Sequence, residues 1–202
     1  MIENWEDQSE DVRAIISQWQ HYEWVRAKNI PCLNDDEGKL EIFAGQIEPS
    51  DIKQGELGDC YFLSSLSALS EYPERIEKLF ESNQVNEQGI YGVKLTKNGI
   101  KQLVVLDDFL PCKDRSPVFS QANGNELWVL ILEKAWAKLH GSYDKIIGGY
   151  AHQALRDLTG APAFEFETSE EDTWKKILDA DRKKFIIQAG ISQDDEMEVA
   201  KF

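Results

Sequence analysis

The chain has 202 residues and a formal net charge of −15 at neutral pH. Hydrophobic residues make up 42% of it, including six Trp, nine Phe and six Tyr, which supports a sizeable core and excludes a disordered chain. The length suits one domain, or one domain and part of another. The negative charge argues against nucleic acid and anionic membranes as partners and leaves room for a divalent cation.

The ends and the cysteines indicate where the protein works. No apolar run approaches the roughly 18–20 residues that cross a bilayer, and the polar, acidic segment 1–7 is unlike a signal peptide. The three cysteines are odd in number and widely spaced, so they form neither a zinc pattern nor a disulfide framework. We therefore expect a reducing, cytoplasmic compartment. Cys32 and Cys112, each beside a proline, are expected to be packing thiols.

Residues 1–41 are predicted to form an approach segment ahead of the core. Residues 9–28 carry an apolar stripe at helical spacing, which predicts a helix that Pro31 ends. The acidic stretch 34–38 predicts a turn, and it lacks the alternating ligands and late glutamate of an EF-hand loop. A short strand is expected at 40–43.

The stretch 54–63, QGELGDCYFL, is the most informative part of the chain. Its glycines and Asp59 predict a tight turn that ends in an N-cap, followed by a buried helix from Cys60 to about Ser70. A thiol in the first turn of a helix lies at the positive end of the dipole, which stabilises thiolate over thiol. Gln54 can direct its amide N–H toward an oxyanion that forms beside that sulfur. The alternatives are a buried structural thiol and a solvated loop glutamine.

Four further elements are expected between this helix and Gly160. They are a helix at 73–79, a β-hairpin at 89–106, a long helix at 126–140 and a short helix at 150–158. Asp107 and Asp108 follow the second strand of the hairpin, and we expect them to cap or pair locally.

The pattern changes after Gly160, which we place at a domain boundary. Residues 161–167 alternate as a strand does, Thr168 and Glu171 form a capping box for a helix to about residue 181, and a second strand is predicted at 185–191. The predicted domains are therefore 42–160 and 161–202.

Several separated motifs resemble those of the calpains, the calcium-dependent cytosolic cysteine proteases. Residues 54–63 resemble the catalytic-cysteine motif, with Tyr61 where most members carry Trp. Residues 104–111, VVLDDFLP, resemble the family's Val-Asp-Asp-x-x-Pro strand, and 125–149 resemble its long helix and exit turn. The resemblance implies an α+β chain with a papain-like cysteine protease fold: the helical first lobe of a calpain-type core with a small antiparallel sheet, then the start of a second protease-core subdomain.

A papain-type enzyme also needs a histidine as general base and an asparagine to orient it, roughly 130–150 residues after the cysteine. Measured from Cys60, that window opens near Ala189 and runs past the last residue. His21 precedes the nucleophile, His140 ends the long helix, where a cationic ring would complement the dipole, and His152 begins the next helix. We expect the triad's histidine and asparagine to be absent from this sequence and the fragment to be inactive in isolation.

The resemblance also implies a calcium site. In the calpain pattern, an Asp three residues before the oxyanion glutamine and the Glu of Asn-Glu-x-Trp bind calcium, with backbone carbonyls upstream. Asp51 and Glu126 occupy those positions. Oxygen ligands suit Ca²⁺, but residues 43–46 do not reproduce the family's Val-x-Gly spacing. The alternative is a salt bridge or an N-cap for either carboxylate.

The predicted function is the catalytic-cysteine half of a calcium-dependent cysteine endopeptidase. Cys60 would attack a peptide carbonyl, and Gln54 with the Cys60 backbone N–H would bind the oxyanion. The implied partners are protein substrates and the second protease-core subdomain, with no nucleic acid and no membrane span. The alternative is a non-catalytic interaction module of calpain fold that keeps the nucleophile without its base.

Overall fold

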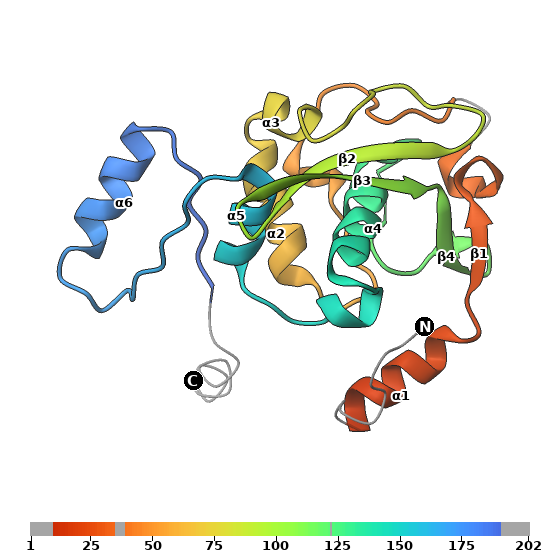
Figure 1. Ribbon diagram of the computed structural model, residues 1–202, viewed down its shortest axis with the longest axis horizontal. Helices are drawn as coiled ribbons and strands as arrows, with labels where there is room; N and C mark the ends of the chain where they lie inside the picture. The colour runs from red at the N-terminus through yellow and green to blue at the C-terminus, as the bar shows by residue number, and fades with distance from the viewer. Residues whose placement is uncertain (1–9, 35–38, 122, 191–202) are drawn as a thin grey trace.

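The computed structural model describes residues 10–34, 39–121 and 123–190, and it combines helices with two small antiparallel sheets (Figure 1). In chain order the helices and strands are α1 (Glu10–Trp19), β1 (Glu23–Arg26), α2 (Cys60–Ser70), α3 (Pro73–Glu77), β2 (Ile90–Lys97), β3 (Ile100–Asp107), β4 (Phe109–Lys113), β5 (Ser116–Pro117), α4 (Trp128–His140), α5 (Ala151–Thr159) and α6 (Thr173–Arg182). Short 3-10 helices lie between them: η2 (Ala27–Asn29), η3 (Pro31–Leu33), η4 (Pro49–Asp51) and η5 (Tyr143–Ile146). This confirms the predicted α+β class. Among the described residues, no helix combines the length and apolar character that crossing a bilayer requires.

Helix α4 lies at the centre of the core. It is buried on nearly every side, as expected of a helix that is apolar around most of its circumference. Trp128 and Trp136 are the largest of its fully buried side chains. The ring of Trp136 stacks on Phe62 of α2, with centroids 4.9 Å apart and planes 13° apart. This aromatic pair fixes the first turn of α2 against α4.

The predicted hairpin is present as β2 and β3. Tyr91, Val93 and Leu95 alternate into the core, and the hairpin packs against α4 and α5. Asn98 and Gly99 form its two-residue turn with φ of 52° and 77°, the left-handed conformations that such a turn requires. The pattern of alternating apolar residues around an Asn-Gly turn therefore located this element correctly.

The second sheet, in the order β1-β4-β5, was not predicted. The expected helix at 9–28 ends at Trp19, and residues 23–26 instead form β1, which pairs antiparallel with β4. The expected strand at 40–43 is reduced to one parallel bridge between Glu41 and Glu126. These pairings join segments more than 80 residues apart, so periodicity within either segment cannot reveal them.

Helix boundaries differ from prediction in one place that matters for the site. Helix α4 begins at Trp128, with Leu127 at the N-cap, so Glu126 lies before the helix and not in its first turn. The backbone N–H of Leu127 donates to Glu41 O at 3.0 Å. Helix α3 ends at Glu77, two residues early, and α5 ends at Thr159, followed by Gly160, whose φ of 71° suits a glycine C-cap.

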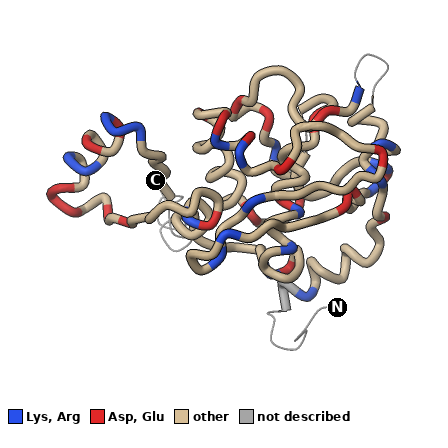
Figure 2. The backbone as a smooth tube through the Cα atoms, turned by 45° about the horizontal axis from the view of Figure 1, so that its top comes forward, with Lys and Arg blue, Asp and Glu red and all other residues tan. Residues whose placement is uncertain are grey.

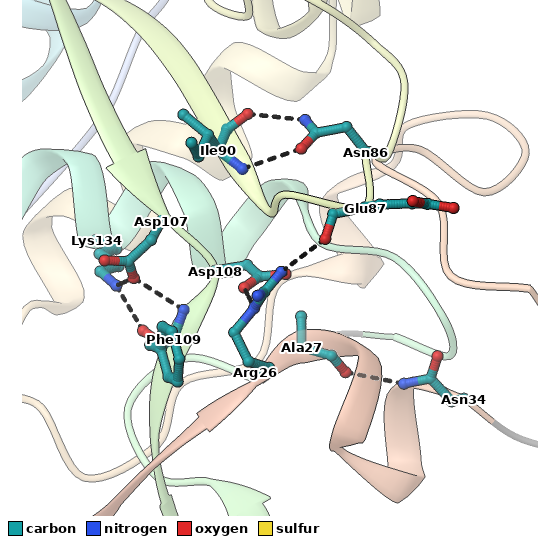
Figure 3. Close-up of polar contacts among 10 residues, drawn as sticks. All are labelled: Arg26, Ala27, Asn34, Asn86, Glu87, Ile90, Asp107, Asp108, Phe109 and Lys134. Atoms are coloured by element: carbon teal, nitrogen blue, oxygen red, sulfur yellow. Dashed lines mark hydrogen bonds and ion pairs between the residues drawn. The ribbon is translucent and has the colours of Figure 1, made fainter.

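Asp107 and Asp108 tie the hairpin to its neighbours (Figure 3). The Arg26 guanidinium of β1 donates to both carboxylate oxygens of Asp108. The ammonium of Lys134 on α4 donates to Asp107 Oδ1 at 2.5 Å. The Asp107 carboxylate also accepts the Phe109 N–H at 2.9 Å. The prediction of local capping is confirmed for Asp107 through the Phe109 N–H, whereas Asp108 pairs with a residue that is distant in the sequence, Arg26.

The segment after Gly160 extends away from the body to α6 (Figure 1) and then returns to it, where the Ser65 hydroxyl of α2 donates to Gln188 Oε1 at 3.0 Å. Residues 161–167 and 183–190 run without strand pairing, so the strand predicted at 161–167 is wrong, and so is the part of 185–191 that the structure describes. Acidic and basic residues lie close together along α6 and the turn before it (Figure 2). Large apolar side chains here are exposed: Phe164, Phe166, Trp174 and Phe185. The alternation that predicted strands has no partner strand to pair with in this part of the chain. The boundary at Gly160 stays a prediction.

Candidate active site

The loop that leads to Cys60 is held by a close approach between backbones. A Cβ added at Gly55 would overlap the carbonyl oxygen of Phe119, so only glycine fits there. The next N–H, of Glu56, donates to Val118 O at 2.7 Å. The first glycine of the motif therefore serves the packing of the loop against residues 118–119.

Cys60 is the first residue of α2 and is exposed. Exposure contradicts the alternative of a buried structural thiol at this position. Asp59 occupies the N-cap position as predicted, but its side chain makes no capping hydrogen bond. Its backbone carbonyl accepts the N–H groups of Phe62 and Leu63 at 2.8 and 3.1 Å, which begins the helix without a side-chain cap.

Gln54 lies on the same loop, six residues before Cys60, and is exposed. Its amide Nε2 donates to the Leu57 carbonyl at 3.5 Å, at the long limit for a hydrogen bond. This weak contact folds the side chain over the loop and leaves it free to rotate toward another acceptor.

The turn after η5 lies on the other side of the nucleophile loop. The N–H of Gly148 donates to Gly58 O at 2.8 Å. A Cβ on Gly149 would overlap the ring of Tyr61, so the backbone runs directly across that ring. The Tyr61 hydroxyl accepts the indole N–H of Trp136 at 3.1 Å. Tyr61 therefore occupies the position where most family members carry tryptophan, and its hydroxyl oxygen has a hydrogen-bond partner there.

Two buried carboxyl groups behind Cys60 were not predicted. Asp59 is 0% exposed and Glu133 on α4 is 3% exposed. Burial raises the pKa of Asp59 to about 7. Burial, and then the charge of Asp59, raises the pKa of Glu133 well above its usual range. The sequence did carry a signal for this pair: Glu133 lies inside the apolar run of α4, and a charged residue is rarely buried unless it has a partner.

The structure brings the two candidate calcium ligands together. Asp51 in η4 and Glu126 before α4 are 6% and 3% exposed. Burial, and then the charge of Asp51, raises the pKa of Glu126 to about 7. Asp51 Oδ1 accepts the Asn123 amide at 3.4 Å, and Glu126 Oε2 accepts the Ala44 N–H at 3.3 Å.

The alternatives for Asp51 and Glu126 were a salt bridge and an N-cap, and the structure supports only the second, for Asp51 alone. In the part of the chain that the structure describes, neither forms a salt bridge, whereas Asp51 does close a capping box with Glu48 at the start of η4. No described group of three or more His, Cys, Asp or Glu side chains is arranged to hold a metal. A facing pair of desolvated carboxylates nevertheless fits a hard cation, which would neutralise the repulsion that raises the pKa of Glu126.

Two of the histidines are engaged by other groups. His140 Nδ1 lies 2.9 Å from the Trp136 carbonyl, and its Nε2 lies 2.5 Å from Lys97 Nζ. Burial lowers the pKa of His140, and the nearby Lys97 ammonium opposes a second positive charge, which argues against the cationic ring expected at the helix end. His152 begins α5 as predicted, and its Nδ1 lies 3.3 Å from Glu165 Oε2.

The other two cysteines have different environments. Cys112 is buried, as expected of a packing thiol, and burial raises its pKa to about 11. Cys32 is exposed, so the expectation that it packs in the core is wrong. Desolvation still raises the pKa of the Cys32 thiol.

An exposed cysteine at the uncapped start of a buried helix, within a mixed α and β body, fits a cysteine protease core of papain-like fold. The sequence model described as calpain family cysteine protease matches residues 7–202. The chain belongs to the calpain family.

The curated relatives agree with this assignment. The chain is 36% identical over 189 residues to the calpain-type cysteine protease DEK1 of Arabidopsis thaliana, which covers 88% of the chain and 9% of that protein. It is 35% identical over 149 residues to human calpain-9, with coverage of 71% and 22%. It is 35% identical over 152 residues to the mouse calpain-1 catalytic subunit, with coverage of 72% and 21%. The chain thus spans a small part of each relative.

Proposed function

We propose that this chain is the catalytic-cysteine half of a calcium-dependent calpain-type endopeptidase, with Cys60 as the nucleophile. The observation that carries the proposal is the exposed thiol at the first residue of α2, where no side chain caps the helix. The dipole of α2 favours the thiolate, and the unblocked N-terminus favours an anion beside it.

The reaction that this arrangement supports is acyl transfer. The sulfur of Cys60 bonds to the peptide carbonyl carbon, and the carbonyl electron pair moves to oxygen. The Cys60 N–H and the Gln54 amide, which is held only by one long hydrogen bond, donate to that oxyanion. Collapse expels the amine, which takes a proton, and water then cleaves the thioester. The base that moves these protons is proposed to be the histidine of the second protease-core subdomain, oriented by its asparagine.

Two features support a second subdomain as the partner. His140 and His152 are engaged by Lys97 and Glu165. The segment after Gly160 also exposes aromatic side chains that a partner lobe would cover. Protein substrates would then bind between the lobes, and we place the enzyme in the cytoplasm.

Calcium is proposed to bind between Asp51 and Glu126. A bound ion would supply positive charge that replaces the proton favoured by the raised pKa of Glu126. Asp51 precedes Gln54 by three residues, and Glu126 precedes α4 by two. Bringing both carboxylates onto one ion would therefore tie the loop that carries the oxyanion donor to the helix that supports Cys60.

A peptide-hydrolysis assay tests the proposal. The 202-residue chain should show no Cys60-dependent turnover, because acid–base catalysis supplies roughly 10²–10⁴-fold that a thiol and an oxyanion site alone lack. A longer protein that includes the second subdomain should hydrolyse the same fluorogenic peptide, and Cys60→Ser should abolish the activity. Cys60-dependent turnover by the 202-residue chain, or Cys60-independent turnover by the longer protein, would overturn it.

The other candidate is a non-catalytic module of the same fold. The engagement of both helix-borne histidines away from Cys60 also fits this candidate. Gly-His and Asn-x-Trp blocks in the gene, within about 100 residues downstream, would favour the protease, since the papain pattern places the base and its orienter there.

A further inference from the structure

The buried carboxyl groups of Asp59 and Glu133 lie directly behind the proposed nucleophile. Neither oxygen of Asp59 has a hydrogen-bond donor, and neither does Glu133 Oε1, among the groups that the structure describes. The two side chains come from different parts of the fold: Asp59 immediately precedes α2, and Glu133 lies in the middle of α4. Two ionised carboxylates in this position would repel each other and would leave buried charge unpaired.

The groups that face the pair do not supply a positive charge. Ser120 lies against Glu133, and hydrogen bonding from its backbone and hydroxyl opposes the rise in the Glu133 pKa without adding charge. Tyr143 of η5 lies near both carboxyls, and Tyr61 lies near Asp59. Asp107 acts on Tyr143 from further away and is itself paired with Lys134. Within the described ranges, no lysine, arginine or histidine forms an ion pair with either buried carboxyl.

Protonation of one of the two carboxyls gives the pair a hydrogen-bond donor of its own. A protonated carboxyl donates one O–H, and the partner carboxylate accepts it, so one proton satisfies oxygens of both. The raised pKa values of Asp59 and Glu133 agree with retention of that proton near neutral pH. A metal ion is a weaker alternative, because the pair has no third described acidic, histidine or cysteine side chain beside it.

The consequence concerns the start of α2. Aspartate is among the preferred N-cap residues because its carboxylate accepts helix N–H groups. Asp59 occupies that position and makes no such bond. Its carboxyl is instead buried against Glu133, so the N-terminal end of α2 stays open beside Cys60.

We propose that Asp59 and Glu133 share one proton and act as positioning residues, keeping the Asp59 carboxyl away from the helix N-terminus so that no carboxylate charge opposes the Cys60 thiolate or an oxyanion beside it. This inference rests on the proposed function for the role of the Cys60 thiolate, whereas the shared proton can be measured independently. Without Glu133, the Asp59 carboxylate gains by turning to accept the N–H of Tyr61 or Phe62, and its negative charge would then lie beside Cys60 and oppose the thiolate.

The shared proton is tested by a ¹³C NMR titration of the side-chain carboxyl carbons in the 202-residue chain, with a chelator present. Asp59 and Glu133 should titrate together, in two coupled steps that both lie above the usual range of about 4. Independent titration of both groups below about pH 5 would overturn the proposal. This measurement requires no activity and no variant.

The positioning role is tested with a pair of substitutions. Glu133→Gln keeps a permanent donor for Asp59, so the Cys60 alkylation rate relative to Cys32 should stay within about twofold of wild type. Glu133→Leu removes the donor, so Asp59 should titrate as an ordinary helix cap, and the Cys60 rate should fall by about fivefold or more, because a carboxylate at the cap opposes the thiolate. The exposed Glu77→Gln is the matched control and should change nothing.

Two outcomes separate this inference from the proposed function. Coupled titration together with slow alkylation of wild-type Cys60 would retain the shared proton and remove the protease assignment. A folded Glu133→Leu variant in which the Cys60 rate is unchanged would remove the positioning role. If Glu133→Leu does not fold, an altered Cys60 rate in Glu133→Gln would do the same.

Discussion

The candidate calcium pair makes a prediction about stability that requires no catalysis. The pKa of Glu126 rises from 4.5 to about 7 on folding, chiefly through burial and then through the charge of Asp51. A group with a raised pKa in the folded state stabilises the protein fully below its unfolded pKa, and that contribution is lost as pH rises through the folded pKa. Stability from Glu126 should therefore decline between about pH 4.5 and pH 7 when calcium is absent.

The size of this effect follows from the pKa difference. At 1.36 kcal/mol per pKa unit, the change corresponds to roughly 3 kcal/mol at pH 8. Glu126→Gln carries no charge, so at pH 8 without calcium it should be more stable than wild type, and at pH 4 the two should be similar. The exposed Glu77→Gln serves as the matched control and should follow wild type at both pH values.

Calcium should reverse the loss in wild type. At about 100 times its dissociation constant, calcium should stabilise the folded state by roughly 2.7 kcal/mol, which raises the melting temperature of a chain of this size by about 5–10 °C. The assay is thermal melting at pH 8 with and without calcium, for wild type, Asp51→Ala and Glu126→Gln. Absence of a calcium-induced rise in wild type, or an equal rise in both variants, would refute the reasoning.

Three further predictions concern the packing around the site, each measured by urea unfolding. Phe62→Ala removes the ring that stacks on α4 and should cost about 3–5 kcal/mol; a cost below 1 kcal/mol would mean that the first turn of α2 is held by other contacts. Gly55→Ala forces a methyl group onto the Phe119 carbonyl and should cost about 1–3 kcal/mol, whereas Gly124→Ala, where space is open, reports only the cost of a positive φ. Arg26→Met leaves Asp108 buried without its partner and should cost about 3–5 kcal/mol; a change no larger than that of Lys175→Met, at an exposed ion pair, would contradict it.

The sequence predicted the elements whose signals are local. The nucleophile helix follows from an apolar run behind a turn, and the hairpin from alternation around Asn98 and Gly99. Helix α5 follows from its glycine C-cap. Each of these patterns lies within one short window, so the chain's own periodicity is sufficient.

Elements that depend on distant partners were missed. β1 is extended because it pairs with β4, whose residues lie 83 to 89 positions later in the chain, and the residues of β1 alone also fit a helix. Residues 161–167 show strand alternation but lie without a strand to pair with. Alternation indicates that a segment can form a strand, whereas the partner decides whether it does.

The candidate site was predicted unevenly for the same reason. Cys60 and Gln54 lie in one contiguous motif, and the resemblance supplied Asp51 and Glu126 as a pair. The Asp59 and Glu133 contact joins a helix N-cap residue to the middle of another helix. Asp59 was therefore interpreted as an ordinary cap, because burial and a carboxyl partner arise only from the packing of α2 on α4.

The most direct test of the central claim is the reactivity of Cys60 in the folded chain. Mass-spectrometric mapping of iodoacetamide labelling compares Cys60 with Cys32, which is also exposed, and with Cys112, which is buried. Cys60 should label fastest, because thiolate character and access together set the rate, and the three rates should converge after denaturation. Labelling of native Cys60 at or below the rate of Cys32 would contradict its assignment as the nucleophile.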